Sequence, residues 1–318
     1  MSPDARIDVV YTWVKGDWPG YWEQLQSQAG KPQDLNPNRY RDNLDLLRYG
    51  LRSLEAYVPW AGRVHLVTAR PQLPEWLRAG AGGLRVVHHD EFMDAADLPT
   101  FSSFAIACNL HRLPGISPRF LYVEDDYLFG RPVAEGDFIA PDGRVKVYRR
   151  LERLSAARRD DDPALSPWEA ARVHTNRLLD ETYGRARRRV VAHAPLIWDV
   201  AAWHRMAQRW PEDLRRTSAS RFRSARNVAP EQLYGYYLLY EGGGAAVPTL
   251  AAYRDSAYVG LDNSLPWQRV ALRYLRWARP KFYCLNDGFG AQPNAKVVAL
   301  VREALEAAYP RPSRFERA

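Results

Sequence analysis

Apolar and polar residues alternate in blocks over residues 7–126, and these blocks predict strands and helices in turn. Ile7–Val14 is a β-branched and aromatic run closed by Gly16, which predicts a buried strand. Leucines at helical spacing predict a helix over Arg41–Tyr57. Strands are also expected at Arg63–Thr68, Leu84–His88 and Arg119–Val123, with a short helix from Pro74 and another over Phe104–Leu113. This alternation predicts an α/β fold whose mostly parallel central sheet carries helices on both faces.

The second half of the chain has a different pattern. Residues 151–190 are rich in arginine and aspartate and contain two prolines, which predicts a helical or mobile insertion within a single domain spanning 1–318. Val190–Asp199 then predicts a strand, and Lys281–Asp287 is another apolar run that ends in a polar pair. Helices are expected at Ala201–Trp210, Pro230–Tyr240 and Asn294–Ala308.

Three acidic residues, Glu124, Asp125 and Asp126, end the apolar run that predicts the fourth strand. Carboxylates are costly to bury unless a cation lies beside them, and hard oxygen ligands suit Mg²⁺ or Mn²⁺ bridging to a phosphate. The alternative is an acidic turn that only caps the next element. Ligands of parallel sheets bind beyond the carboxyl ends of the strands, which is where this turn falls.

Composition limits the class of protein. A chain of 318 residues with 46% hydrophobic content can bury a full core. The net charge of +8 favours anionic partners, such as nucleotide sugars, phosphorylated glycans, nucleic acid or an anionic membrane face. Zinc-finger spacing, RNP-like aromatic strands and heptads are absent, so nucleic acid is not expected as a partner.

Two further features bear on the compartment. No apolar run approaches the roughly 20 residues of a membrane span, and the first residues lack a signal-peptide pattern. We therefore expect a cytoplasmic protein without a transmembrane span, and peripheral association with the inner face of the membrane stays open. Cys108 and Cys284 are far apart and lack partners at metal-ligand spacing, so both are expected to be core thiols.

Four ordered sequence blocks cover nearly the whole chain. The first block is Ile7–Gly16, and the fourth is Cys284–Asp287. The second runs from Arg41–Asn43 to Glu124–Asp126 and includes Leu98–Ser102 and His111–Arg112. The third runs from His193–Pro195 through Arg223 to Gln232. In these blocks the chain resembles the Stealth family, which contains bacterial capsular polysaccharide phosphotransferases and the catalytic subunit of lysosomal-enzyme N-acetylglucosamine-1-phosphotransferase. The chain departs from the family pattern at Lys15, Ser102–Phe104, Glu124 and Gly288, near the expected donor and acceptor positions.

The resemblance implies a GT-A-like, Rossmann-like nucleotide-sugar transferase fold. It also implies a hexose-1-phosphate transferase, which moves a sugar 1-phosphate, for example N-acetylglucosamine 1-phosphate, from a UDP-sugar to a glycan hydroxyl. The reaction would release UMP, require Mg²⁺ or Mn²⁺, and serve capsule or exopolysaccharide synthesis.

Attack on a diphosphate needs cations, positioning and a base more than a covalent nucleophile. Asp125 and Asp126 are expected to hold the metal, and Asp287 is a further candidate ligand whose alternative role is a turn or cap. His193 is the candidate to touch the reacting phosphate or the acceptor hydroxyl, because an imidazole titrates near neutrality. A histidine on an apolar run is more often structural, but the resemblance favours a functional role, together with Arg223 as the phosphate-gripping arginine.

Other residues are expected to contact the nucleotide. The resemblance makes Arg41 and Asp42 candidates for contacting the diphosphate and organising the metal site, and Asp42 is counted with the catalytic residues. The end of the first strand suits base stacking and close backbone approach, through Tyr11, Thr12, Trp13 and Gly16.

Three residues outside these groups carry weaker expectations. His111 is a second-rank candidate for the site and alternatively packs in the core. Arg48 and Arg52 share a helix face, and one of them is expected to be only a surface cation.

Two alternatives remain from the sequence. The first is a conventional metal-dependent GT-A glycosyltransferase, in which attack at the anomeric carbon releases UDP. The second is a non-catalytic basic module that binds acidic glycan or nucleic acid through arginines, with an affinity that falls steeply with salt. The position of the acidic cluster at a strand end argues against this module.

Overall fold

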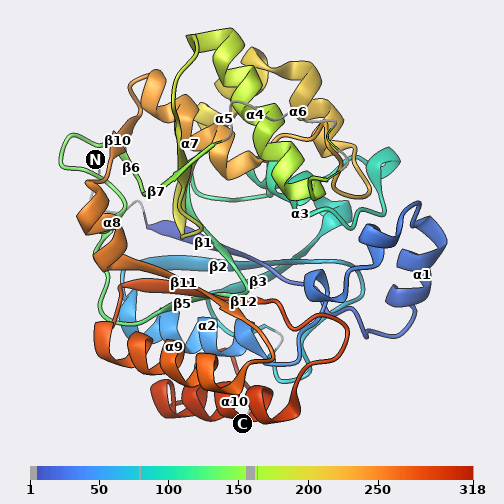
Figure 1. Ribbon diagram of the computed structural model, residues 1–318, viewed down its shortest axis with the longest axis vertical. Helices are drawn as coiled ribbons and strands as arrows, with labels where there is room; N and C mark the ends of the chain where they lie inside the picture. Colours follow the sequence, from blue (N-terminus) through green and yellow to red (C-terminus); the bar gives the residue numbers. More distant parts are fainter. Residues whose placement is uncertain (1–5, 79, 155–161, 163, 318) are drawn as a thin grey trace.

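The computed structural model describes residues 6–78, 80–154, 162 and 164–317. A five-stranded sheet with strand order β3-β2-β1-β4-β9 forms its centre (Figure 1). β2 and β4 flank β1 in parallel, β3 is parallel to β2, and β9 is antiparallel to β4. The strands are β1 (Ile7–Thr12), β2 (Ala61–Thr68), β3 (Leu84–His88), β4 (Arg119–Glu124) and β9 (Leu196–Asp199). The predicted α/β class with a mostly parallel central sheet is confirmed.

Helices cover both faces of the central sheet, as predicted (Figure 1). One side carries α3 (Ser103–Asn109), α4 (Pro167–Tyr183), α5 (Val200–Arg209), α6 (Pro211–Ser218) and α7 (Pro230–Tyr240). The other side carries α2 (Leu46–Tyr57), α9 (Leu265–Ala278) and α10 (Ala295–Ala308). Two further helices, α1 (Tyr21–Gln28) and α8 (Thr249–Asp255), lie at the periphery.

A second, three-stranded sheet joins the central one through the acidic turn. Its order is β11-β12-β5, formed by β11 (Ser256–Leu261), β12 (Phe282–Asp287) and β5 (Tyr127–Phe129). The chain passes from β4 through the acidic turn into β5, and β5 pairs antiparallel with β12. The amide of Leu285 donates to the carbonyl of Asp126 at 3.0 Å. The carboxyl end of β12 is therefore held against the acidic turn.

Two small ribbons complete the strands. β6 (Val145–Val147) pairs in parallel with β10 (Gly244–Ala246), and β7 (Arg149–Arg153) pairs antiparallel with β8 (Arg189–Val191). Of the predicted insertion over 151–190, residues 155–161 and 163 lie outside the described residues. The described remainder holds the end of β7, all of α4 and the start of β8.

The apolar run Val190–Asp199 forms two strands instead of the predicted one. β8 ends at Val191 and β9 begins at Leu196, so His193 lies in the connection between two separate sheets. Pro195 has no amide hydrogen to donate, which disfavours a continuous ladder through this connection. The break carries His193 away from the sheet and toward the acidic turn.

Two predicted helices differ from the structure. The helix expected over Arg41–Tyr57 begins only at Leu46, because Asp45 adopts a left-handed backbone with φ of 52° that a helix cannot continue through. The short helix expected from Pro74 is wrong. Leu77 forms an isolated bridge with Glu316, so this segment pairs with the end of the chain instead of with its own turn.

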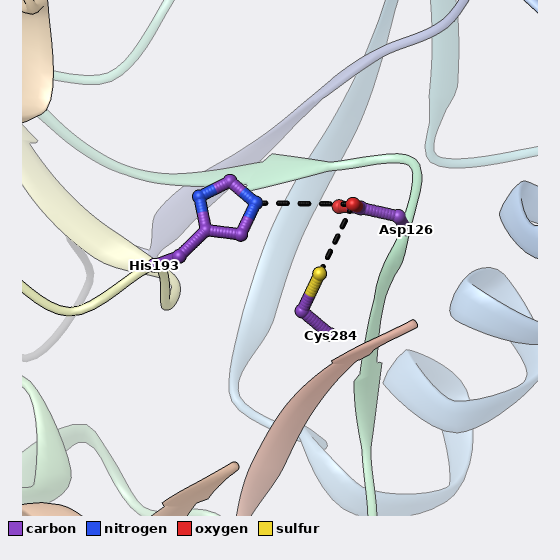
Figure 2. A group of neighbouring side chains, drawn as sticks. All are labelled: Asp126, His193 and Cys284. Carbon is purple, nitrogen blue, oxygen red and sulfur yellow. Dashed lines mark hydrogen bonds and ion pairs between the residues drawn. The ribbon is translucent and has the colours of Figure 1, made fainter. Parts of the chain in front are cut away.

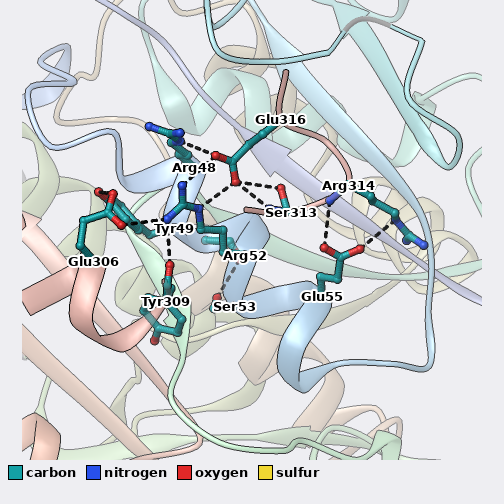
Figure 3. A network of polar contacts seen from close by, with 11 residues as sticks. Arg48, Tyr49, Arg52, Ser53, Glu55, Glu306, Tyr309, Ser313, Arg314 and Glu316 are labelled. Atoms are coloured by element: carbon teal, nitrogen blue, oxygen red, sulfur yellow. Dashed lines mark hydrogen bonds and ion pairs between the residues drawn. The ribbon is translucent and has the colours of Figure 1, made fainter. Parts of the chain in front are cut away.

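Glu316, near the end of the chain, contacts two arginines of α2 (Figure 3). The Arg52 guanidinium is buried and donates to Glu316 at 2.8 Å and to Glu306 at 3.1 Å. Arg48 donates to Glu316 at 2.5 Å. The prediction that one of the two is only a surface cation is therefore wrong, because Glu316 is brought over α2 by a segment far away in sequence.

Candidate active site

The carboxyl ends of four parallel strands meet at one edge of the central sheet, as the sequence predicts. Thr12 at the end of β1 is in register with both Val67 of β2 and Glu124 of β4, and Thr68 is in register with His88 of β3. The acidic turn Glu124–Asp126 therefore lies directly beside the end of β1. This edge is where ligands of such sheets bind.

Asp126 is the centre of a group of side chains from three parts of the chain (Figure 2). Its Oδ2 accepts from Sγ of Cys284 at 3.0 Å and from Nδ2 of Asn286 at 3.2 Å, and it lies 3.8 Å from Nε2 of His193. The other carboxylate oxygen, Oδ1, is buried without a hydrogen-bond partner. One face of this carboxylate is thus held by the protein, while the other oxygen remains available to a ligand.

His193 lies between two carboxylates. Its Nδ1 is 3.9 Å from Oε1 of Glu124, and its ring contacts Tyr127 edge-on at 4.7 Å between centroids. Burial disfavours the charged ring, but Glu124 and Asp126 outweigh it and raise the pKa of His193 to about 9. At neutral pH the imidazole is therefore protonated and acts as a cation within the site.

Carboxyl groups are closely spaced on the neighbouring side of the turn. Burial, Asp126, Asp42 and Glu124 together raise the pKa of Asp125 well above its usual range. Burial likewise raises the pKa of Asp42 to about 6, although its Oδ2 accepts from the Trp13 indole at 2.7 Å. Closely spaced carboxylates of this kind are stabilised by a cation.

The donor set favours a hard divalent cation bound by oxygen. Asp126, His193 and Cys284 place potential ligand atoms within 4.8 Å of one another. However, the Cys284 thiol donates to Asp126, and burial and that carboxylate raise its pKa well above the ordinary value, so it stays protonated and ligates poorly. Mg²⁺ or Mn²⁺ would therefore use carboxylate oxygens, of which Oδ1 of Asp126 is the buried unpartnered one.

Asp287 lies further along β12 and has another partner. Its Oδ1 accepts from the amide of Phe289 at 2.9 Å, which is the turn role that the sequence left open. Its Oδ2 lies 3.5 Å from Nε of Arg41. Within the described residues, Asp287 and Asp125 do not belong to a group of three or more potential metal ligands.

A cavity of about 800 Å³ opens beside the acidic turn. His193, Glu124 and Asn286 form part of its wall, together with Arg223 and Glu231. Arg223 donates to Oγ of Ser103 at 2.5 Å, and its guanidinium lies 4.5 Å from the centre of the Phe104 ring. The cavity is large enough for a substantial ligand and combines cations with carboxylates.

Glu231 is a site residue that the sequence analysis missed. It lies in the first turn of α7, lines the cavity with a partly exposed side chain, and interacts electrostatically with His193 and Arg223. Burial raises the pKa of Glu231, while those two cations oppose the rise. The available signal was its position within the third sequence block, directly before Gln232. Cys284 was predicted to be a core thiol, which its burial confirms, but its contact with Asp126 was not foreseen.

A second cavity of about 390 Å³ gathers three of the predicted nucleotide-binding residues. Gly16, Arg41 and Asp42 line it together with Trp22 and Tyr40. A Cβ atom at Gly16 would lie 2.7 Å from Cβ of Tyr40, so only glycine permits this close approach. The smaller cavity is lined by residues between 16 and 43, and one of them, Asp42, interacts electrostatically with Asp125 of the acidic turn.

The remaining candidates occupy supporting positions. Tyr11 is 0% exposed, and its hydroxyl donates to the carbonyl of Gly50 at 3.3 Å. Trp13 is buried and holds Asp42. The Thr12 hydroxyl lies 3.4 Å from that of Tyr122. His111 stacks on Trp203 with 5.8 Å between ring centroids, in agreement with the packing role.

Three family models match the chain: Stealth protein CR2, conserved region 2, over residues 39–147; Stealth protein CR3, conserved region 3, over 192–240; and Stealth protein CR4, conserved region 4, over 274–318. These ranges contain the acidic turn, His193, Arg223, Glu231 and Asp287.

Curated relatives match over almost the whole chain. An exopolysaccharide phosphotransferase of Streptomyces coelicolor is 37% identical, over 100% of this chain and 54% of its own length. The exopolysaccharide phosphotransferase CpsY of Mycobacterium tuberculosis is 33% identical, over 98% of this chain and 58% of its own length. The chain thus spans about half the length of the curated relatives that it matches.

Solved structures that match the backbone of this chain include the galactosyltransferase LgtC in complex with donor and acceptor sugar analogs. The match has a TM-score of 0.44 and 12% identity, and it covers 96% of this chain and 95% of that one. Mouse xyloside xylosyltransferase 1 in its apo form has a TM-score of 0.42 and 12% identity, covering 88% and 97%. Both TM-scores are low, so the likeness is loose and indicates neither a donor nor an acceptor for this chain.

Proposed function

The chain belongs to the Stealth family, and on this premise we propose that it transfers a sugar 1-phosphate, for example N-acetylglucosamine 1-phosphate, from a UDP-sugar to a glycan hydroxyl. UMP would leave, and the product would be a phosphodiester-linked glycan of a capsule or exopolysaccharide. The names of the curated relatives, which are exopolysaccharide phosphotransferases, support this reaction class.

The observation that carries the proposal is the meeting of opposite charges at one cavity. His193 and Arg223 supply two cations, and Glu124 and Glu231 supply two partly buried carboxylates beside them. Phosphoryl transfer needs cations toward the non-bridging oxygens and a base toward the attacking hydroxyl. This wall offers both kinds of group.

The proposed reaction is an in-line displacement at the β-phosphorus of the donor. A bond forms between the acceptor hydroxyl oxygen and this phosphorus, and the bond from the phosphorus to the bridging oxygen breaks, so that UMP leaves with the electron pair. The hydroxyl proton passes to a carboxylate. We assign this role to Glu124, because burial and the nearby Glu231 and Asp126 raise its pKa above the ordinary value despite the opposing charge of His193.

His193 and Arg223 would contact the reacting phosphate. The protonated ring of His193 donates hydrogen bonds and a positive charge, and the planar fork of Arg223 suits two phosphate oxygens at once. The hydrogen bond from Arg223 to Ser103 and its position over Phe104 hold the guanidinium in place before substrate binds. Such preorganised cations contribute to catalysis without reorganising during the reaction.

Asp125 and Asp126 would hold Mg²⁺ or Mn²⁺, which supplies positive charge to the diphosphate. Asp287 stays a proposed further ligand, since its Oδ2 is buried without a hydrogen-bond partner. On the donor side we propose Gly16, Arg41 and Asp42, which line the smaller cavity. Thr12 and Trp13 would support that side, whereas Tyr11 is packed in the core and receives no ligand role.

Nucleotide release tests the proposal. The purified protein is incubated with UDP-N-acetylglucosamine and other nucleotide sugars, with Mg²⁺ or Mn²⁺ and then with EDTA. Metal-dependent release of a nucleoside monophosphate is the expected result, and it identifies attack at phosphorus. Release of UDP would instead identify a conventional glycosyltransferase. Binding to acidic glycans that survives Asp126→Asn, without release of any nucleotide, would favour the non-catalytic module.

A further inference from the structure

The outer face of α9 carries an unusual row of exposed apolar side chains. Trp267, Val270, Tyr274 and Trp277 are spaced three, four and three residues apart, so they share one side of the helix. Trp277 is 82% exposed. The opposite side, with Ala271 and Leu275, is buried in the second core cluster. These four residues therefore contribute little to the packing of the helix.

Positive charge runs beside this row. Arg269, Arg273 and Arg276 are exposed, and none of them forms an ion pair with a carboxylate in the part of the chain that the structure describes. The sequence from 263 to 286 contains no aspartate or glutamate. The three arginines lie on the same helix as the apolar row, and no acidic residue of α9 balances their charge.

The apolar row continues toward α8 and the large cavity. Leu250 of α8 is 87% exposed, and Tyr253 of the same helix lines the cavity together with Tyr274 of α9. Arg150 lies over the Tyr253 ring at 4.8 Å. We define the α8–α9 surface as Leu250, Trp267, Val270 and Trp277 with Arg269, Arg273 and Arg276. It adjoins the mouth of the cavity through the two tyrosines.

We propose that the α8–α9 surface binds the headgroup region of an anionic lipid bilayer. Tryptophan side chains favour the boundary between headgroups and acyl chains, and exposed arginines attract anionic headgroups. None of the helices in the described residues combines the length and apolarity needed to cross a bilayer. The proposed contact is accordingly one in which α9 lies along the membrane face.

Two other occupants fit the surface less well. Sugar rings stack on aromatic faces, but Leu250 and Val270 are aliphatic and offer no such face, whereas both suit the apolar part of a membrane interface. A second copy of the chain would bring two unpaired arginine rows against each other in a protein of net charge +8. Charge complementarity therefore selects the anionic bilayer.

Sedimentation of the full chain with sucrose-loaded vesicles tests the proposal without relying on catalytic activity. The chain should bind vesicles of phosphatidylcholine with phosphatidylglycerol, and bind phosphatidylcholine alone much more weakly. The variant Arg269→Ser/Arg273→Ser/Arg276→Ser should lower the partition coefficient by on the order of 10²-fold, because each basic residue near the surface contributes about 1 kcal/mol. Trp267→Ser/Trp277→Ser should lower it by about 10-fold or more.

The matched control removes the same charge elsewhere. Arg185, Arg187 and Arg205 are exposed; the first two follow α4 and the third is in α5, and Figure 1 shows both helices on the opposite side of the molecule from α9. Their triple replacement by serine should leave the partition coefficient within about twofold. Melting temperatures near that of the unmodified chain establish that each variant is folded. Absence of vesicle binding, or an equal loss in the control, overturns the proposal, and so does lipid-free self-association that the tryptophan variant abolishes.

Discussion

Nε2 of His193 lies 3.8 Å from Oδ2 of Asp126, although the two residues lie in connections between different pairs of strands. The first follows β8 and the second lies between β4 and β5. Their ion pair connects the predicted metal side of the site to the predicted phosphate side. Loss of either partner removes a charge that the other faces at 3.8 Å, so the two positions are coupled.

Asp126→Asn and His193→Ala should each lower kcat by about 10²-fold or more. The first change removes a charged oxygen proposed to bind the metal, and the second removes a cation proposed to face the reacting phosphate. Nucleotide release under saturating donor is the measurement. Asp142→Asn is a suitable control, since Asp142 is exposed and pairs only locally with Arg144. Near-normal kcat in both variants, with normal folding, would contradict the site assignment.

Glu231→Gln should lower kcat by about 10-fold to 10²-fold with little effect on folding. Glutamine keeps the shape of the side chain but removes the negative charge that faces His193 and Arg223 across the cavity wall. The expected loss lies in kcat more than in KM for the donor, because the carboxylate orients charged groups and does not enclose the nucleotide. The exposed Glu135→Gln serves as the matched control. Equal kinetics for both variants would remove Glu231 from the site.

The edge of the central sheet where the strands end could be predicted from sequence, because the patterns that mark strand ends are local. β-branched runs ending in polar residues mark β1 to β4, and parallel pairing brings their ends together. The acidic turn was therefore identified with its neighbours. The meeting of Asp126 with Cys284 depends on β5, which has only three residues and gives no clear pattern, and the approach of His193 depends on the break between β8 and β9.

Burial was harder to predict than position. Tyr11 belongs to a strand end that suits a ligand, yet its side chain is buried in the core and donates to the carbonyl of Gly50 in α2. Arg52 has the spacing of a surface cation, but a carboxylate more than 250 residues away covers it. Such contacts between distant segments leave no periodic signal in one sequence, and only the folded chain reveals them.

Gly16→Ala should lower both stability and apparent affinity for the donor. The added methyl group would lie 2.7 Å from Cβ of Tyr40 and 2.9 Å from its carbonyl oxygen, so the loop that lines the smaller cavity must shift. Overpacking of this kind costs about 1–3 kcal/mol. Thermal unfolding and KM for the donor measure the two effects. Gly30→Ala is the control, because nothing lies within 4 Å of the added atom; indistinguishable melting curves would contradict the close packing.

Glu316 should make stability depend on pH in the acidic range. Burial opposes its charge, but Arg52, the amide of Ser313 and Arg48 outweigh burial and lower the pKa of Glu316 to about 2 (Figure 3). A carboxyl group whose pKa is lowered by folding stabilises the protein fully above its ordinary pKa, near 4.5, and loses that effect as the pH falls toward 2. The ion pairs that clamp the end of the chain onto α2 should therefore weaken below pH 4.5.

Glu316→Gln isolates this contribution. At pH 6 the variant should be less stable than the unmodified chain by about 2–4 kcal/mol, because two arginines, one of them buried, lose their charged partner. Urea unfolding at several pH values between 6 and 3 gives the comparison. The difference between the two proteins should shrink as the pH falls, since protonation of Glu316 makes the unmodified chain resemble the variant. A difference that stays constant over this range would show that the carboxylate is not held ionised by Arg48 and Arg52.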